Sequence, residues 1–116
     1  MRYPPTIFID LDGTICEHQS PPWDKMMQPL PGVHQRFRDW WQKGYYIVVC
    51  TGRPDCLRQK TISELARLNI LYNQLLTGLT SGPRYLINDK KPYDREIKMA
   101  VSIELERNEG LQEFTL

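Results

Sequence analysis

Residues 6–14, Thr-Ile-Phe-Ile-Asp-Leu-Asp-Gly-Thr, constrain the fold of this chain more than any other stretch. The apolar run Ile7-Phe8-Ile9 has the length and the β-branched content of a buried strand. Two carboxylates, Asp10 and Asp12, follow it, and then Gly13, a residue that tolerates the backbone angles of a tight turn. Ligands of open α/β sheets bind just beyond the carboxyl ends of strands. We therefore expect both carboxylates in a functional site, although polar surface turns use the same residue types.

The composition is that of an ordinary soluble domain. The chain has 116 residues, of which 41% are hydrophobic and 25% charged, so we expect a single domain over residues 1–116. A net charge of +1 makes nucleic acid an unlikely partner. No apolar stretch is long enough to span a membrane, and residues 1–5 lack the apolar core of a signal peptide. We expect no membrane contact and a cytoplasmic location.

The cysteines exclude two further classes of protein. There are three of them, an odd number, and none forms a Cys-x-x-Cys pair, which argues against a disulfide framework and against a zinc site. A catalytic cysteine needs a basic partner, and nothing in the sequence pairs either histidine with a thiol. Cys50 ends an apolar run, which is typical of a small buried hydrophobic residue.

Strand and helix patterns alternate along the first two thirds of the chain. Residues 15–31 contain four prolines and no clear period, so they are predicted to form a loop or flap. Val33, Phe37, Trp40 and Trp41 have the spacing of one helix face, and Gly44 is expected to end that helix.

The next elements are read in the same way. Residues 45–50 predict a second buried strand, and residues 51–54 a turn. Asp55 is expected to cap a helix that continues to about Asn69. Residues 71–76 and 85–87 predict two short strands, residues 97–105 alternate like a half-exposed edge strand, and residues 106–116 remain poorly determined. Alternation of strands and helices predicts βαβ units and a parallel sheet.

In a parallel sheet, the polar groups at three of the predicted strand ends face one crevice. These groups are Asp10 with Asp12, then Thr51, and then Asp89. Phosphoryl transfer requires such a set, because it needs a nucleophile, a divalent cation and donors that orient the phosphoryl oxygens. Carboxylates suit Mg²⁺, which prefers oxygen ligands.

Asp-x-Asp-Gly-Thr after an apolar strand resembles the signature of the haloacid dehalogenase (HAD) superfamily, and the resemblance extends from Ile7 to about Asp94. It implies a three-layer, Rossmann-like α/β fold with helices on both faces of a mostly parallel sheet. It also implies that Asp10 is the nucleophile and Asp12 the general acid/base.

The same resemblance assigns roles to the second strand end and to a metal site. The Thr51 hydroxyl would bind a phosphoryl oxygen, with Gly52 beside it in the substrate site. Mg²⁺ would be held by the side chains of Asp10 and Asp89 and by the backbone carbonyl of Asp12.

Family members also carry a Lys or Arg that neutralises the phosphoryl group. Here the best candidate is Arg84, with Lys90 and Lys91 as alternatives, and each of the three could also be a solvated loop residue. In the acidic motif Asp89 is followed by Asp94, which either joins the metal site or caps the next element.

The gaps between Asp12, Thr51 and Arg84 are too short for a cap domain, so the chain resembles the capless branch of the superfamily. We expect a Mg²⁺-dependent phosphatase that acts through an aspartyl-phosphate, with a sugar phosphate or similar metabolite as substrate. One alternative is a phosphatase for nucleotides or nucleic-acid 3′-phosphate ends. Another is a catalytically silent module that binds a phosphorylated ligand or a protein. A capless site implies a large substrate or a homo-oligomer whose neighbouring subunit closes it, and residues 19–31 could serve as a small flap.

Overall fold

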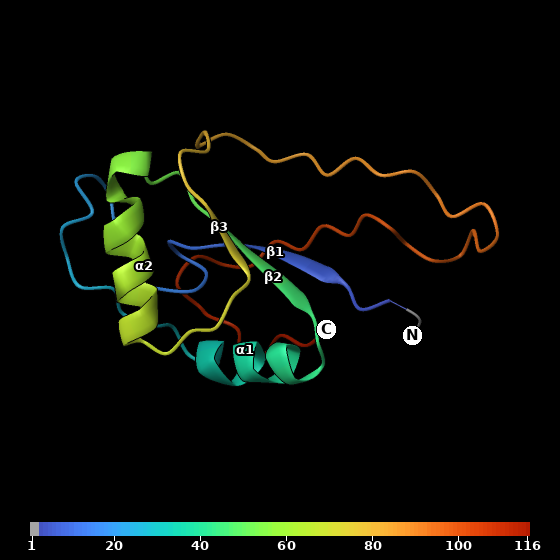
Figure 1. The fold of residues 1–116 in the computed structure, drawn as a ribbon, viewed down its shortest axis with the longest axis horizontal. Helices are drawn as coiled ribbons and strands as arrows, with labels where there is room; N and C mark the ends of the chain where they lie inside the picture. Colours follow the sequence, from blue (N-terminus) through green and yellow to red (C-terminus); the bar gives the residue numbers. More distant parts are fainter. Residues whose placement is uncertain (1–2) are drawn as a thin grey trace.

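The computed structural model describes residues 3–116 and contains a small α/β fold (Figure 1). The elements in chain order are β1 (Thr6–Asp10), α1 (Val33–Gln42), β2 (Tyr46–Cys50), the short 3-10 helix η1 (Asp55–Leu57), α2 (Arg58–Arg67) and β3 (Gln74–Leu76). The three strands are parallel and lie in the order β1-β2-β3. The predicted α/β class with a parallel sheet is confirmed, and residues 3–116 include no cap domain. Residues 1 and 2 lie outside the described part. They belong to residues 1–5, for which the sequence predicts no signal peptide.

One face of the sheet carries the hydrophobic core. Ile9 of β1 lies opposite Val49 of β2, and Val49 lies opposite Leu75 of β3. Side chains alternate between the faces of a strand, so these three project to the same side. The buried residues of this core are Ile9, Leu11, Ile15, Cys16, Met27, Leu30, Val33, Phe37, Trp40, Ile47, Val49, Leu65, Ile70, Leu75 and Leu111.

Helix α1 packs on the core through the stripe that its spacing predicts. Val33, Phe37 and Trp40 are no more than 2% exposed. Trp41, which we also placed on this stripe, is 40% exposed, because it lies at the margin of the buried face. Gly44 follows the helix with a φ of +76°, so the predicted stop is confirmed.

Helix α2 begins differently from the prediction. Asp55 does not cap it, because Asp55 starts η1 and α2 follows only at Arg58. The Asp55 carboxylate instead accepts a hydrogen bond of 2.5 Å from the Thr77 hydroxyl. Leu65 and Thr61 turn toward the core and are fully buried.

Both helices contribute to the same core, so the helices expected on the second face of the sheet are not found among residues 3–116. The strand order explains this arrangement. Two successive right-handed crossovers that advance in one direction along a sheet place both helices on the same side. The opposite face is partly open, with Phe8 54%, Tyr46 40% and Leu76 38% exposed.

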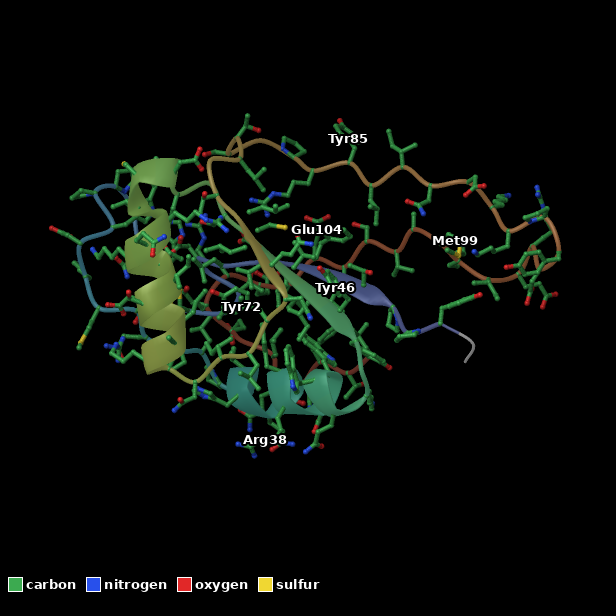
Figure 2. All side chains as sticks on the ribbon, viewed as in Figure 1. Arg38, Tyr46, Tyr72, Tyr85, Met99 and Glu104 are labelled. Atoms are coloured by element: carbon green, nitrogen blue, oxygen red, sulfur yellow. The ribbon has the colours of Figure 1, made fainter. Side chains whose placement is uncertain are left out.

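Residues 80–105, which we call the arm, leave the sheet altogether. Figure 1 shows the arm in orange, running along the long axis to the end of the molecule opposite α2 and returning. The strands predicted at 85–87 and 97–105 are therefore wrong, and only 74–76 of the predicted strand 71–76 is extended in the sheet. Within the described residues, no backbone–backbone hydrogen bond involves the arm. Tyr85, which Figure 2 shows pointing outward, is 87% exposed.

The C-terminal residues are more ordered than their polar composition indicates. Leu111 is 1% exposed, and its amide donates to the Pro31 carbonyl at 2.8 Å. The Arg36 guanidinium of α1 donates to the carbonyls of Leu111 at 3.1 Å and Gln112 at 2.8 Å, and also to that of Phe114. The tail is thus tied to the first turns of α1. No helix in the described part of the chain has the length and apolar character needed to cross a membrane.

Candidate active site

The carboxylate pair lies where β1 passes into a tight loop: Asp10 is the last residue of the strand, and Asp12 is on the loop. The amides of Thr14, Ile15 and Cys16 all point at the Leu11 carbonyl, at 3.2, 2.9 and 3.2 Å. Gly13 has a φ of +89°, a conformation that L-residues with side chains rarely adopt. The buried Leu11 and Ile15 anchor this loop to the core. The backbone that carries Asp10 and Asp12 is therefore held in place at the end of the strand.

Asp10 faces an open part of the site, where it meets Arg84. Its Oδ1 lies 3.1 Å from the Arg84 Nη1, and both side chains are 43% exposed. The structure thus brings the predicted nucleophile and the predicted phosphoryl-binding cation together, across 74 residues of sequence. The exposure of both groups leaves them accessible to a ligand, and their catalytic roles stay predictions.

Asp12 is held by an arginine that the sequence analysis missed. Arg53 donates from Nε to Asp12 Oδ2 at 2.9 Å and from Nη2 to Oδ1 at 2.6 Å, so both carboxylate oxygens are engaged. Burial acts to lower the pKa of the Arg53 guanidinium, but its hydrogen bonds and attraction to Asp12 outweigh burial, and that pKa lies above its ordinary value. Arg53 is therefore a permanent cation beside Asp12.

A register argument could have found this pair. Asp10 lies opposite Cys50, so the residues two positions beyond each strand end are neighbours. Asp12 therefore emerges beside Gly52, and the next residue is Arg53. The resemblance assigns roles to Thr51 and Gly52 of this turn but none to Arg53, which the strand register brings next to Asp12.

Thr51 and Gly52 form the floor of the site on the β2 side. Thr51 is 2% exposed, and its Oγ1 accepts a hydrogen bond from the Arg53 amide at 3.1 Å. Because the hydroxyl oxygen acts here as acceptor, its proton stays available for donation to a ligand. A Cβ on Gly52 would lie 3.3 Å from the Leu79 carbonyl, so glycine permits the close approach of that loop.

The structure does not bring Asp89 to the other predicted metal ligands. Asp89 lies on the arm and is exposed, because residues 85–87 do not join the sheet beside β1. Among residues 3–116, no three His, Cys, Asp or Glu side chains are grouped so that they could hold a metal ion. Lys90, Lys91 and Asp94 are also on the arm, and within residues 3–116 none of them forms a hydrogen bond or ion pair with Asp10 or Asp12.

Two oxygen donors in the loop still suit a hard cation. The Asp10 carboxylate is open, and the Asp12 backbone carbonyl accepts no hydrogen bond from the described residues. Mg²⁺ prefers such ligands and retains several waters when a protein supplies only one or two. The donor chemistry at Asp10 and Asp12 therefore fits Mg²⁺, with the Asp12 side chain committed to Arg53.

Cys16 is a buried thiol beside Asp12. Burial, followed by the nearby charge of Asp12, raises the pKa of Cys16 to about 12. Its Sγ lies 3.7 Å from Asp12 Oδ1. A thiol with this pKa stays protonated near neutral pH.

A parallel α/β sheet with one carboxylate at the end of its first strand and a second on the following loop agrees with the HAD-like class that the sequence resembles. The chain belongs to the family of haloacid dehalogenase-like hydrolases, whose model matches residues 7–76, and the resemblance seen in the sequence is thus confirmed. The search of curated proteins found no match.

Three solved structures are similar to this chain. A chain in the Pnkp1/Rnl/Hen1 complex is 26% identical, with a TM-score of 0.57, over 72% of this chain and 31% of that one. A second structure, of the Pnkp1/Rnl/Hen1 RNA repair complex, gives 27% identity and a TM-score of 0.57 over 70% and 28%. A Vibrio cholerae protein is 21% identical, with a TM-score of 0.50 over 72% and 78%, and shares the fold. This chain thus spans less than a third of the two repair-complex chains.

Proposed function

We propose that this protein is a Mg²⁺-dependent phosphatase that hydrolyses phosphomonoesters through a phosphoryl group on Asp10. The observation that carries the proposal is the pairing of the open Asp10 carboxylate with Arg84 at 3.1 Å, next to an Asp12 fixed by Arg53. The proposal gives each of these groups a role at the carboxyl end of the sheet. Asp10 is the nucleophile, Arg84 is the cation for the phosphoryl oxygens, and Asp12 is the second carboxylate, which transfers protons.

In the first step, an Asp10 oxygen attacks phosphorus, and the bond from phosphorus to the ester oxygen breaks. Asp12 gives its proton to the departing oxygen, which leaves as an alcohol. In the second step, Asp12 takes a proton from water, and the water oxygen displaces Asp10 as inorganic phosphate forms. Arg84 and the Thr51 hydroxyl orient the phosphoryl oxygens in both steps.

The Asp10 carboxylate and the Asp12 carbonyl would hold Mg²⁺, with Asp89 as a further ligand only if the arm moved. When bound, the cation offsets negative charge between the nucleophile and the phosphoryl group. Arg84 performs part of the same task in this chain, because its guanidinium already lies against Asp10.

For the substrate, we propose a sugar phosphate or a similar small metabolite. The net charge of +1 supplies little attraction for a polyanion. A second candidate is a nucleotide or a nucleic-acid 3′-phosphate end, which is favoured by the 26–27% identity to chains of an RNA repair complex. An open site for a small substrate also motivates a homo-oligomer in which a neighbouring copy excludes water.

The test is a screen of phosphorylated metabolites, nucleotides and 3′-phosphorylated oligonucleotides, each with Mg²⁺ and with a chelator. We expect Mg²⁺-dependent phosphate release, highest for a metabolite, and a specific activity that rises with protein concentration if a second copy closes the site. Best activity on oligonucleotides would favour the second candidate. Absence of hydrolysis together with binding of a phosphorylated ligand would identify a silent module.

A further inference from the structure

Both side chains of the Arg53–Asp12 pair are largely buried. The Arg53 side chain is 1% exposed, and that of Asp12 is 13% exposed. Removing an arginine from water is costly, and replacing a buried ion pair by apolar residues is often neutral or stabilising. The pair is thus poorly explained by stability alone, and its geometry indicates another use.

The support under Arg53 makes its guanidinium a rigid reference point. Its amide donates to the Thr51 Oγ1 at 3.1 Å, and its carbonyl accepts from the Gly78 amide at 2.7 Å. The backbone on both sides of the side chain is therefore fixed. A planar guanidinium that donates to both oxygens of a carboxylate also fixes the plane of that carboxylate.

Proton transfer by Asp12 depends on that plane. A carboxyl group that protonates a departing oxygen must be within hydrogen-bond reach of it and correctly oriented. With both oxygens engaged by Arg53, the carboxylate keeps one orientation, and only its remaining lone pairs can carry or accept a proton.

We propose that Arg53 is a positioning residue that holds Asp12 in the orientation from which it protonates the leaving group. This inference rests on the proposed phosphatase function and extends it to a residue that does not itself contact the substrate. Arg53 would then matter most when the leaving group needs a proton, and least when it departs readily as an anion.

The test compares two substrates in Arg53→Lys, which keeps the positive charge but loses the two-pronged geometry. One substrate is p-nitrophenyl phosphate, whose leaving group departs without a proton, and the other is a simple alkyl phosphate. The quantity measured is kcat/KM with Mg²⁺, because it reports the steps up to departure of the leaving group. General acid catalysis is typically worth about 10²–10⁴-fold, so we expect a loss of about 100-fold or more for the alkyl ester and under about 10-fold for the aryl ester.

Two further variants complete the design. Asp12→Asn should show the same selectivity, and Arg53→Lys combined with Asp12→Asn should lose little more than Asp12→Asn alone, because both act on one step. Arg38→Lys, an exposed arginine on α1 that Figure 2 labels, is the matched control and should behave as wild type. Thermal melts identify any variant that fails to fold.

Equal losses for the two esters, or no loss for either, would overturn the positioning role while leaving the phosphatase proposal intact. Additive losses in the double variant would overturn it as well. If the wild-type protein hydrolyses neither ester, the proposed function itself fails, and the positioning role fails with it. The selectivity between esters thus separates the two hypotheses.

Discussion

At the scale of single residues, Asp10 is the carboxylate whose replacement tests the proposed nucleophile. An amide is a poor nucleophile, so we expect Asp10→Asn to reduce phosphate release by about 10⁴-fold or more. The side chain is 43% exposed, so the melting temperature should change little. Asp39→Asn, on α1 with its side chain 36% exposed, is the control for the same chemical change. Retention of wild-type turnover in Asp10→Asn would show that phosphorus is attacked by another group.

Arg84 is the cation on which the phosphoryl-binding role depends. A donor aimed at transition-state charge is typically worth about 10²–10³-fold in rate, so Arg84→Ala should lower kcat by about that factor. Lys90→Ala and Lys91→Ala should stay near wild type, because among the described residues Asp10 forms its ion pair with Arg84 and with neither lysine. Steady-state kinetics on the three variants distinguishes them. A large defect in either lysine variant, with Arg84→Ala unaffected, would assign the role to that lysine instead of Arg84.

The three cysteines should differ sharply in reactivity. Burial raises the pKa of Cys50 as well as that of Cys16, which reaches about 12, whereas Cys56 is exposed. The reactive species is the thiolate, so raising the pKa and burying the sulfur both slow modification. Ellman's reagent at pH 8 should therefore modify one thiol quickly and the other two only after denaturation. Cys56→Ser should abolish the fast phase, and a fast phase that survives would contradict this assignment.

At the scale of elements, the two tryptophans of α1 give a matched comparison. Trp40 is 2% exposed and packs against Phe37 with ring centroids 5.3 Å apart and the ring planes tilted by 46°, whereas the adjacent Trp41 is 40% exposed. Truncation of a buried aromatic residue typically costs about 3–5 kcal/mol, so Trp40→Ala should lower the free energy of unfolding by about that amount. Trp41→Ala should cost less than half as much. Urea denaturation measures both, and equal losses would show that α1 packs on the sheet through a different face.

The elements near the N-terminus could be predicted because their signals are local. Ile7-Phe8-Ile9 and residues 45–50 are short apolar runs, and the 3.6-residue spacing of Val33, Phe37 and Trp40 belongs to one helix. Residues 97–105 alternate just as regularly but form no strand. A strand needs a partner at its edge, and period-two alternation in sequence does not specify one.

The residues of the candidate site also differ in whether a local stretch of sequence predicts them. Asp10 and Asp12 were found because a strand, a turn and two carboxylates are contiguous in sequence. The Arg53–Asp12 pair depends on how β1 and β2 are aligned, which no single segment encodes. The prediction that Asp89 lies at the site assumed that residues 85–87 form a strand of the sheet. They form no strand, and Asp89 is therefore not grouped with Asp10 and Asp12 in the described residues.

At the scale of the whole molecule, the arm should be the least protected part of the chain. Within the described residues, its amides form no backbone–backbone hydrogen bonds, whereas those of β2 are paired on both sides. Amide exchange requires the hydrogen bond to open, so unpaired amides exchange first. Hydrogen–deuterium exchange read by mass spectrometry should label residues 80–105 at the earliest times and residues 46–50 last. Strong protection of 85–87 would mean that this segment pairs with a sheet edge in solution.

The residues that flank the arm on either side are hydrogen-bonded to the loops that carry the candidate site. The Leu79 amide donates to the Thr51 carbonyl at 3.2 Å, and the Asn108 amide donates to the Gly13 carbonyl at 2.9 Å. Any molecule that bound the arm and displaced its two ends would therefore also displace the backbone of the Thr51 and Asp12 loops. Linkage makes such an effect reciprocal: if occupancy of the arm changed the affinity for phosphate by some factor, phosphate would change the affinity of the arm by the same factor. Binding of a molecule to the arm would in this way change the phosphate affinity of the site without contact between the two ligands.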